Sequence, residues 1–274
     1  MKNYKWKIVA ASAKGKGHAE CQDSFCYDIL DKLAITVVAD GAGSQKNSKF
    51  GSSLASKITL KLFKQYVTEN SLDKYKISQD KWREDSISIL KQVKEKLKKV
   101  AFRKKFDINT MASTIIVSIL TFNTIYTIHI GDGRAGYMNG NQEWKSLITP
   151  YHGEEVGMTV FLTTDYIWQF SQDYIETNII EDNIQAVTLL SDGAENASYE
   201  CIIFDKEKQK YINTNKPYSG FYNPLVEFVL NNKNSAEEDL NIVWKKFLED
   251  GTPSFITEHD DKTILLAVKY EISH

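Results

Sequence analysis

An aspartate followed by a glycine ends three apolar runs of this 274-residue sequence, at Asp40, Asp132 and Asp192. A strand that ends in this way places a carboxylate at the edge of a sheet, and the glycine lets the backbone approach whatever binds there. Any single Asp-Gly pair is equally typical of an ordinary turn. Because the pattern recurs, it favours one shared site over three unrelated turns.

Two further aspartates lie directly before predicted strands. Asp23 precedes a strand at 25–30, and Asp260 precedes one at 263–270. Carboxylates gathered without cysteine ligands suit hard cations such as Mg²⁺ or Mn²⁺. Several of them at one sheet edge would repel one another, and a bound cation removes that penalty. Two such ions about 4 Å apart can share a water, lower its pKa and hold it for attack on a phosphoryl group.

A carboxylate shared by two cations must reach both of them. Asp40 is the candidate for this position, because Gly41 lets the adjacent carbonyl oxygen approach a metal as well. The alternative interpretation is that all five aspartates are turn residues and helix caps. The order of the motifs along the chain, given below, favours metal binding.

The elements that would position these carboxylates follow from the hydrophobic pattern. Strands are predicted at 4–12, 25–30, 33–39, 112–121, 123–130, 134–138, 143–148, 159–163, 187–190 and 263–270. Helices are predicted at 48–67, with Ser48 as the cap, at 81–104, and near 221–231 and 235–248. Residues 194–220 look loop-like. This layout predicts one α+β domain over residues 1–274, with antiparallel sheets flanked by helices.

Composition excludes several classes of protein. The net charge of −2 argues against a nucleic-acid partner, although lysines gather on the predicted helix 81–104. A solvated face explains those lysines better than a surface for an acidic partner or nucleic acid. No apolar run is long enough to span a membrane, and no signal peptide is visible. Three cysteines without a CxxC pair indicate reduced thiols, so we expect a cytoplasmic protein.

Five short segments in this order resemble the metal-dependent protein phosphatases of the protein phosphatase 2C family, and most closely their compact bacterial branch. The segments are HAECQD at 18–23, VADGAG at 38–43, GDGR at 131–134, LSDG at 190–193 and DDKT at 260–263. The resemblance extends from about residue 8 to residue 268. It implies a four-layer α-β-β-α sandwich of two antiparallel sheets flanked by helix pairs.

The resemblance also implies a binuclear Mg²⁺ or Mn²⁺ site and its ligands. The residue matching Asp40 bridges both metals, Asp192 and Asp260 match ligands of the first, and Asp23 and the Gly41 carbonyl match ligands of the second. Asp132 matches a residue associated with a third, weaker metal. The implied catalytic set is Asp40, Asp192 and Asp260. The implied reaction is hydrolysis of phosphoserine or phosphothreonine by a metal-bound hydroxide, with no phosphoenzyme intermediate.

The sequence departs from the family pattern at a few positions. His18 stands where the family often has an arginine that binds the substrate phosphate, and an imidazole cannot make the bidentate fork of a guanidinium. Lys14 or Lys16, in the same glycine-rich loop, could supply the charge, and His18 itself is either a phosphate contact or a structural residue. The other departures are Gln22 for glutamate, Ala42 for histidine and Asp261 for asparagine. None removes an implied metal ligand, so we expect an active enzyme.

The expected partner is a phosphorylated protein, such as the substrate of a cognate serine/threonine kinase, and the expected state is a monomer. Residues 149–184 fall where the family has a variable flap beside the site. Two other functions stay open at this point. One is a non-catalytic relative that binds phosphoproteins as a regulatory module, and the other is a phosphohydrolase of small molecules. No Walker loop or GxGxxG pattern supports nucleotide binding.

Overall fold

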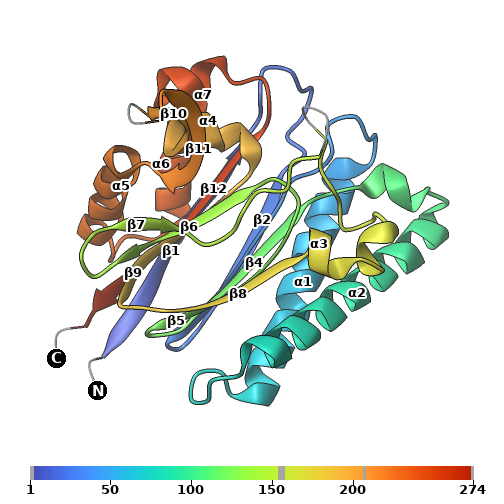
Figure 1. The fold of residues 1–274 in the computed structure, drawn as a ribbon, viewed down its shortest axis with the longest axis horizontal. Coiled ribbons are helices and arrows are strands. Elements are labelled where there is room, and N and C mark those ends of the chain that lie inside the picture. The colour runs from blue at the N-terminus through green and yellow to red at the C-terminus, as the bar shows by residue number, and fades with distance from the viewer. Residues whose placement is uncertain (1–2, 154–157, 206–207, 273–274) are drawn as a thin grey trace.

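Two five-stranded antiparallel sheets pack face to face in the computed structural model, which describes residues 3–153, 158–205 and 208–272 (Figure 1). In spatial order the first sheet contains β1 (Tyr4–Ala13), β12 (Lys262–Glu271), β9 (Ile184–Leu190), β6 (Arg134–Asn139) and β7 (Trp144–Ser146). The second contains β2 (Ser24–Leu30), β3 (Leu33–Ala39), β4 (Ile115–Leu120), β5 (Thr124–Ile130) and β8 (Glu176–Glu181).

Helices cover the outer face of each sheet. The second sheet carries α1 (Ser48–Asn70) and α2 (Gln79–Lys104), and the first carries α5 (Ser219–Asn231) and α6 (Glu237–Asp250) (Figure 1). Shorter elements are η1 (Ile108–Met111), η2 (Tyr166–Trp168), α3 (Ser171–Tyr174), η3 (Asp192–Ala194), α4 (Glu195–Ser198) and α7 (Pro253–Thr257). A separate two-stranded hairpin consists of β10 (Tyr199–Asp205) and β11 (Lys210–Pro217). The predicted α-β-β-α sandwich is therefore confirmed.

Three hydrophobic clusters join the four layers. In β1, Trp6 and Ile8 face the other sheet, whereas Val9 and Ala11 face the α5–α6 layer. This alternation follows from the two-residue period of a strand, and it explains why β1 is apolar on both faces. The third cluster lies between the second sheet and α1–α2, where the buried Trp82 donates its indole N–H to the Thr127 carbonyl at 2.8 Å.

The first residues of α1 and α2 are held by side-chain hydrogen bonds, and one predicted cap is corrected by the structure. Ser78 caps α2, because its hydroxyl accepts the backbone N–H of Lys81. Ser48, predicted as a cap, is instead the first residue of α1, and the side chain of Asn47, in the cap position, makes no capping hydrogen bond to the helix. The Ser48 hydroxyl donates to the Gln45 carbonyl at 2.7 Å, so it fastens the preceding turn.

The secondary structure differs from the prediction in three places. Residues 159–163 are not a strand, although Val160 and Leu162 are buried in the α1–α2 cluster. The fifth strand of the second sheet is β8, whose polar sequence ETNIIE gave no strand signal. Residues 199–217, expected to be loop-like, form the β10–β11 hairpin. The predicted flap at 149–184 includes residues 154–157, which lie outside the described residues, and its end belongs to β8.

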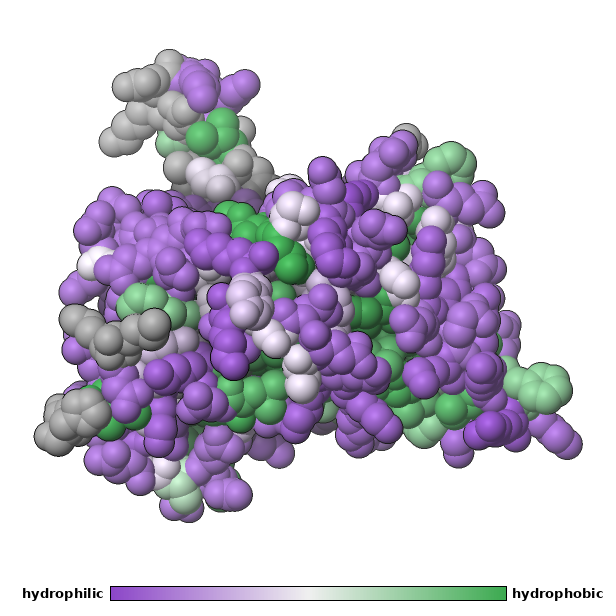
Figure 2. All heavy atoms as spheres, turned by 90° about the horizontal axis from the view of Figure 1, so that it is seen from below, coloured by the Kyte–Doolittle hydropathy of each residue, from purple (hydrophilic) through white to green (hydrophobic). Residues whose placement is uncertain are grey.

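Hydrophilic side chains cover most of the end of the sandwich seen in Figure 2, with smaller hydrophobic areas between them. Within the described part of the chain, no helix combines the length and the apolar character needed to cross a membrane.

Candidate metal centre

The five aspartates singled out in the sequence all lie at one end of the two sheets, because the charges of the other four all act on Asp40. Asp40 follows β3 and Asp192 follows β9, while Asp23 directly precedes β2. Antiparallel pairing brings strand starts and strand ends together, as the register shows by pairing Ser24 with Ala39 and Ile264 with Leu190. The sandwich therefore gathers carboxylates that are up to 237 residues apart in the chain, since Asp23 and Asp260 meet at this end.

Asp40, Asp132 and Asp192 form the centre of this group. One carboxylate oxygen from each lies within 4.8 Å of the other two. Burial raises the pKa of Asp40 well above its ordinary value, and the nearby charges of Asp23, Asp192, Asp132 and Asp260 raise it further. Burial and the charges of Asp132 and Asp260 likewise raise the pKa of Asp192 to about 8. The group therefore holds protons tightly unless another cation replaces them.

Asp23 is oriented by two hydroxyl groups. Ser191 Oγ and Thr263 Oγ1 both donate to Asp23 Oδ2, at 2.7 and 2.8 Å. The other oxygen, Oδ1, is buried and accepts no hydrogen bond from the described residues, and the same holds for Asp192 Oδ1. Buried carboxylate oxygens are normally paired, so two orphaned oxygens in one acidic group fit a divalent cation. Burial also raises the pKa of Asp23 to about 6.

Asp260 stands in a second cluster with His18 and Asp261. His18 Nδ1 lies 2.9 Å from Asp261 Oδ2 and 3.7 Å from Asp260 Oδ1. Burial lowers the pKa of His18, but the neighbouring Asp261 and Asp260 outweigh it, and the pKa is raised overall. Asp260 also adds to the raised pKa values of Asp40 and Asp192, so it lies near both. Sequence reasoning grouped Asp260 with those two and did not place it beside His18.

Asp261 fastens the loop between β1 and β2 to the site. It is 1% exposed, and its two oxygens accept the backbone N–H groups of Gly15 at 2.9 Å and Gln22 at 2.6 Å. A Cβ atom on Gly15 would lie 2.2 Å from the Asp260 carbonyl oxygen, so no larger residue fits there. The backbone N–H of Lys16 donates to the Glu258 carbonyl at 3.0 Å, and the Lys16 side chain is exposed.

His18 also lies against the loop that follows Asp40. Its Nε2 atom is 3.2 Å from the position that a Cβ on Gly43 would take. Gly41 is enclosed as well, because a Cβ there would lie 2.6 Å from the Gln22 carbonyl oxygen. Lys14, the other lysine of the loop, donates from Nζ to the His18 carbonyl at 2.6 Å. The loop, His18 and the Asp40 turn thus form one wall of the acidic end.

A buried arginine links the site to the β10–β11 hairpin, and sequence reasoning missed it. Arg134 is 2% exposed and donates from Nε to Glu195 Oε2 at 2.8 Å and from Nη1 to Asn215 Oδ1. Its guanidinium carbon lies 5.3 Å from the centre of the Tyr199 ring. The available signal was an arginine inside a predicted strand, directly after the Asp132 turn.

The predicted flap region borders Asp132. The Tyr151 backbone N–H donates to the Gly131 carbonyl at 2.8 Å. Burial raises the pKa of Asp132, while its own backbone N–H and the nearby His152 lower it in part. In this region the side chains of Tyr166 and Phe170 are exposed, whereas Trp168 packs against the core.

These features define the class of the protein: an α+β sandwich whose acidic end offers a set of carboxylates that could hold a metal ion. The chain belongs to the protein phosphatase 2C family, whose model matches residues 13–242. Members of this family are metal-dependent, in agreement with the donor set at the acidic end.

Relatives and solved structures support this assignment. A protein of Mycoplasma genitalium, named as a putative protein phosphatase, is 31% identical over 145 residues, which are 53% of this chain and 54% of the relative. The chain spans about half the length of the curated relatives it matches. The serine/threonine phosphatase Stp1 from Staphylococcus aureus is 13% identical with a TM-score of 0.56, covering 100% of this chain and 96% of that one. RsbX, crystallised with magnesium, is 15% identical with a TM-score of 0.51, covering 97% and 96%. At these identities the structures establish a shared fold.

Proposed function

We propose that this protein is a serine/threonine phosphoprotein phosphatase that uses two divalent cations, Mg²⁺ or Mn²⁺. The observation that carries the proposal is the group of Asp40, Asp132 and Asp192, whose oxygens lie within 4.8 Å of one another. Carboxylates gathered at one half-buried edge repel one another and destabilise the fold unless a cation binds between them. Family membership adds phosphoryl chemistry to cation binding.

Each proposed ligand has a place at the acidic end. Asp40 would bridge the two cations, Asp192 and Asp260 would complete the first site, and Asp23 and the Gly41 carbonyl would complete the second. Asp132 would serve a weaker third ion. When bound, the cations would lower the pKa of a water that they share and neutralise charge on the phosphoryl group. The protein's own contribution is to hold these oxygens in place through Ser191, Thr263 and the close-packed turns.

Substrate phosphate would meet the wall that carries His18. Because Asp261 contacts Nδ1, the imidazole has a fixed orientation with Nε2 on the side of Gly43. We propose that His18 and the exposed Lys16 contact the phosphate in place of the arginine that the family often has. A histidine supplies one N–H on that side, whereas a guanidinium supplies a fork, so the contact is weaker than an arginine would make.

The remaining proposals concern the cellular role. We infer that the substrates are phosphorylated proteins, that the protein works in the cytoplasm, and that residues 1–274 act as one catalytic unit. The segment after β7 borders Asp132, so it is placed to contact the protein around the phosphorylated residue.

The test is hydrolysis of p-nitrophenyl phosphate by the purified protein, measured without metal and with added Mn²⁺ or Mg²⁺. We expect turnover only with metal, and a severe loss in Asp192→Asn. Phosphoserine, phosphothreonine and phosphotyrosine peptides then establish the substrate class, with the first two preferred.

Ser198→Ala is the matched control, because Ser198 is a buried serine near Asp192 in the chain and its hydroxyl donates to the Ala194 carbonyl at 2.7 Å. It should keep metal-dependent turnover. A folded wild-type protein that binds phosphopeptides but hydrolyses none of these compounds would refute the enzyme and favour a phosphoprotein-binding module.

A further inference from the structure

A basic and aromatic surface lies where α1 begins and α2 ends, and we call it the basic surface. Its members are all exposed: Lys46, Lys49, Phe50, Phe102, Arg103, Lys104 and Lys105. Phe102 is 86% exposed, more than any other large hydrophobic side chain of the described residues. An aromatic ring held in water among cations is typical of a surface that meets a partner.

Contacts between the two helix ends hold the basic surface together. Lys104 Nζ lies 4.9 Å from the centre of the Phe50 ring, and that ring packs edge-to-face on Phe106 at 6.2 Å. The backbone N–H of Asn47 donates to the Thr110 carbonyl at 3.0 Å, and its side-chain amide donates to Thr110 Oγ1 at 2.7 Å. The surface is therefore a built feature with a defined geometry.

The basic surface begins beside the metal centre. A Cβ on Gly41 would lie 3.0 Å from the Ser48 carbonyl oxygen, and Ser48 is two residues from Phe50. An extended peptide advances about 3.3 Å per residue, so residues a few positions from a bound phosphoserine would reach this surface. The exposed Lys14 and Lys16 lie in the loop fastened by Asp261, and Glu20 of the same loop pairs with Lys49 of the basic surface at 2.7 Å. The two basic segments are therefore neighbours beside the acidic centre.

Ion pairs with other described residues neutralise only part of the positive charge of the basic surface. Farther back along α2, Lys94 is buried and pairs with Asp165 at 2.6 Å, and Lys98 pairs with Glu95 at 3.1 Å. Because of these ion pairs, the lysines of α2 do not form the one continuous basic face that the sequence suggested. In the basic surface itself, Lys49 pairs with Glu20 at 2.7 Å. Cations in the last turn of a helix also interact favourably with the helix dipole, and this could explain the lysines and the arginine there. The dipole does not explain the exposed ring of Phe102.

We propose that the basic surface binds acidic residues that flank the phosphorylated serine or threonine of the protein substrate. Arg103 and Lys105 would attract carboxylates of the flanking segment, and Phe102 would pack on an apolar side chain within it. This inference rests on the proposed phosphatase function and adds the class of substrate: phosphoproteins whose sites lie in acidic sequence. Charged groups on such a surface contribute to selectivity and association rate more than to the reaction step.

The experiment compares two phosphoserine peptides of equal length, one with aspartate and glutamate flanks and one with alanine and glycine flanks. The variant is Arg103→Glu/Lys105→Glu. The control is Lys32→Glu/Lys74→Glu, which makes the same change of net charge at the opposite end of the sandwich. We expect the variant to raise KM for the acidic peptide about tenfold, from two attractions lost and two repulsions introduced. Activity on p-nitrophenyl phosphate, which has no flanks, should stay unchanged.

Phe102→Ala should give a smaller rise of KM on the acidic peptide alone. The inference is overturned if both charge variants lose the same activity, or if wild type and variant treat the two peptides alike. Loss of binding to phosphatidylserine vesicles in the variant, with unchanged peptide kinetics, would overturn it in favour of a membrane surface.

If wild type hydrolyses no substrate, the proposed function fails, and fluorescence anisotropy of the two labelled peptides then tests the surface directly. Tighter binding of the acidic peptide, lost in Arg103→Glu/Lys105→Glu but kept in the control, would support the basic surface without turnover. Equal binding of the two peptides would refute it.

Discussion

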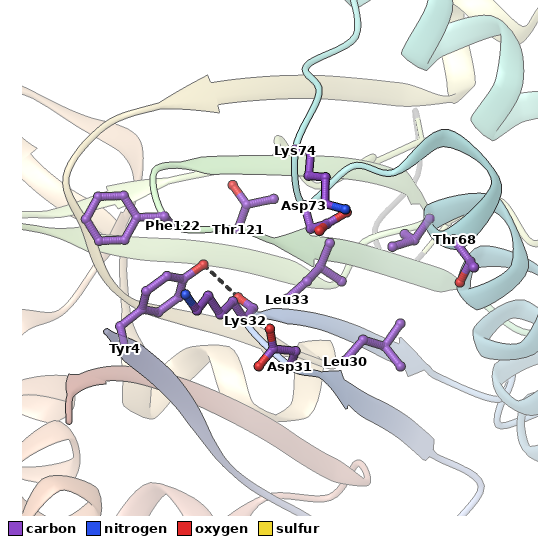
Figure 3. A pocket seen from close by; sticks show the side chains of 11 residues that line it. Tyr4, Leu30, Asp31, Lys32, Leu33, Thr68, Asp73, Lys74, Thr121 and Phe122 are labelled. Carbon is purple, nitrogen blue, oxygen red and sulfur yellow. Dashed lines mark hydrogen bonds between the residues drawn. The ribbon is translucent and has the colours of Figure 1, made fainter. Parts of the chain in front are cut away.

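Both ends of the sandwich contain aspartates, but the two ends differ in the charges that surround those aspartates. At the metal end, Asp40, Asp132 and Asp192 lie within 4.8 Å of one another without a lysine or arginine among them. At the other end, a cavity of about 730 Å³ is lined by both signs of charge, with Asp31 and Asp73 beside Lys32 and Lys74 over an apolar floor (Figure 3). Charges of both signs at the cavity end limit repulsion, whereas carboxylates alone repel one another unless a cation binds.

The connections between strands explain the difference. At the cavity end, short turns join β2 to β3, β4 to β5 and β8 to β9, and their residues are needed for turn geometry. Asp31, for example, adopts a φ of 55° in a two-residue turn. At the metal end, the chain leaves the sheets for longer excursions, such as the two helices between β3 and β4. Because these longer connections do not need tight turns, their side chains can contribute to a binding site.

The largest expected effect comes from Asp40→Asn. Turnover should fall more than about a hundredfold, beyond the range of changes that only perturb ligand orientation, since both cations lose a shared ligand. At the same time the metal-free protein should melt higher, because one member of the repelling group becomes neutral. Asp31→Asn at the cavity end should change neither property. Near-wild-type metal-dependent activity in Asp40→Asn would refute the metal centre, and a lower melting temperature would refute the repulsion.

A smaller effect is expected for Ser191→Ala, which removes one of the two hydroxyls that orient Asp23. Affinity for Mn²⁺ should drop about 10- to 100-fold, as is usual when a group that orients a metal ligand is lost. Isothermal titration calorimetry measures this directly, with Ser198→Ala as a buried serine that does not contact Asp23. Equal Mn²⁺ affinity in both variants would show that Asp23 needs no such support or binds no metal.

A third expected effect is a dependence of stability on pH in the metal-free protein. The pKa of Asp192 is raised from 3.8 to about 8, and that of Asp23 to about 6, so the folded state binds protons more tightly than the unfolded state. Stability should therefore fall as pH rises from about 4 to about 8. Melting temperatures in EDTA between pH 5 and 8 should decrease, and saturating Mn²⁺ should flatten that slope. A rise of the melting temperature with pH in EDTA would contradict the raised pKa values.

Much of the acidic end could be predicted because its signals are local. An apolar run that stops at an Asp-Gly pair contains both the strand and its end, so the positions of Asp40 and Asp192 after their strands follow directly. The contacts of Ser191 and Thr263 with Asp23 join residues that are 168 and 240 positions apart. Such contacts depend on how the two sheets are stacked, which no local pattern encodes.

The errors in the predicted secondary structure also arise because local sequence does not encode tertiary packing. Val160 and Leu162 are buried but belong to no strand. Their alternating apolar pattern is the same in sequence as that of a real strand, so the prediction could not tell the two apart. In β8 the polar ends, Glu176 and Glu181, hide a strand at the edge of its sheet. The β10–β11 hairpin belongs to neither five-stranded sheet, so the usual alternation of buried and exposed residues was not available to reveal it.

The place of β12 has a consequence for how the chain folds. This strand is synthesised after every other strand, yet it lies between β1 and β9 in the first sheet. On the ribosome, the edges of β1 and β9 that pair with β12 therefore stay unpaired until β12 emerges. Pairing of such distant segments is slow, and open strand edges attract other chains. We therefore expect a newly made chain to depend on chaperones until β12 closes the sheet.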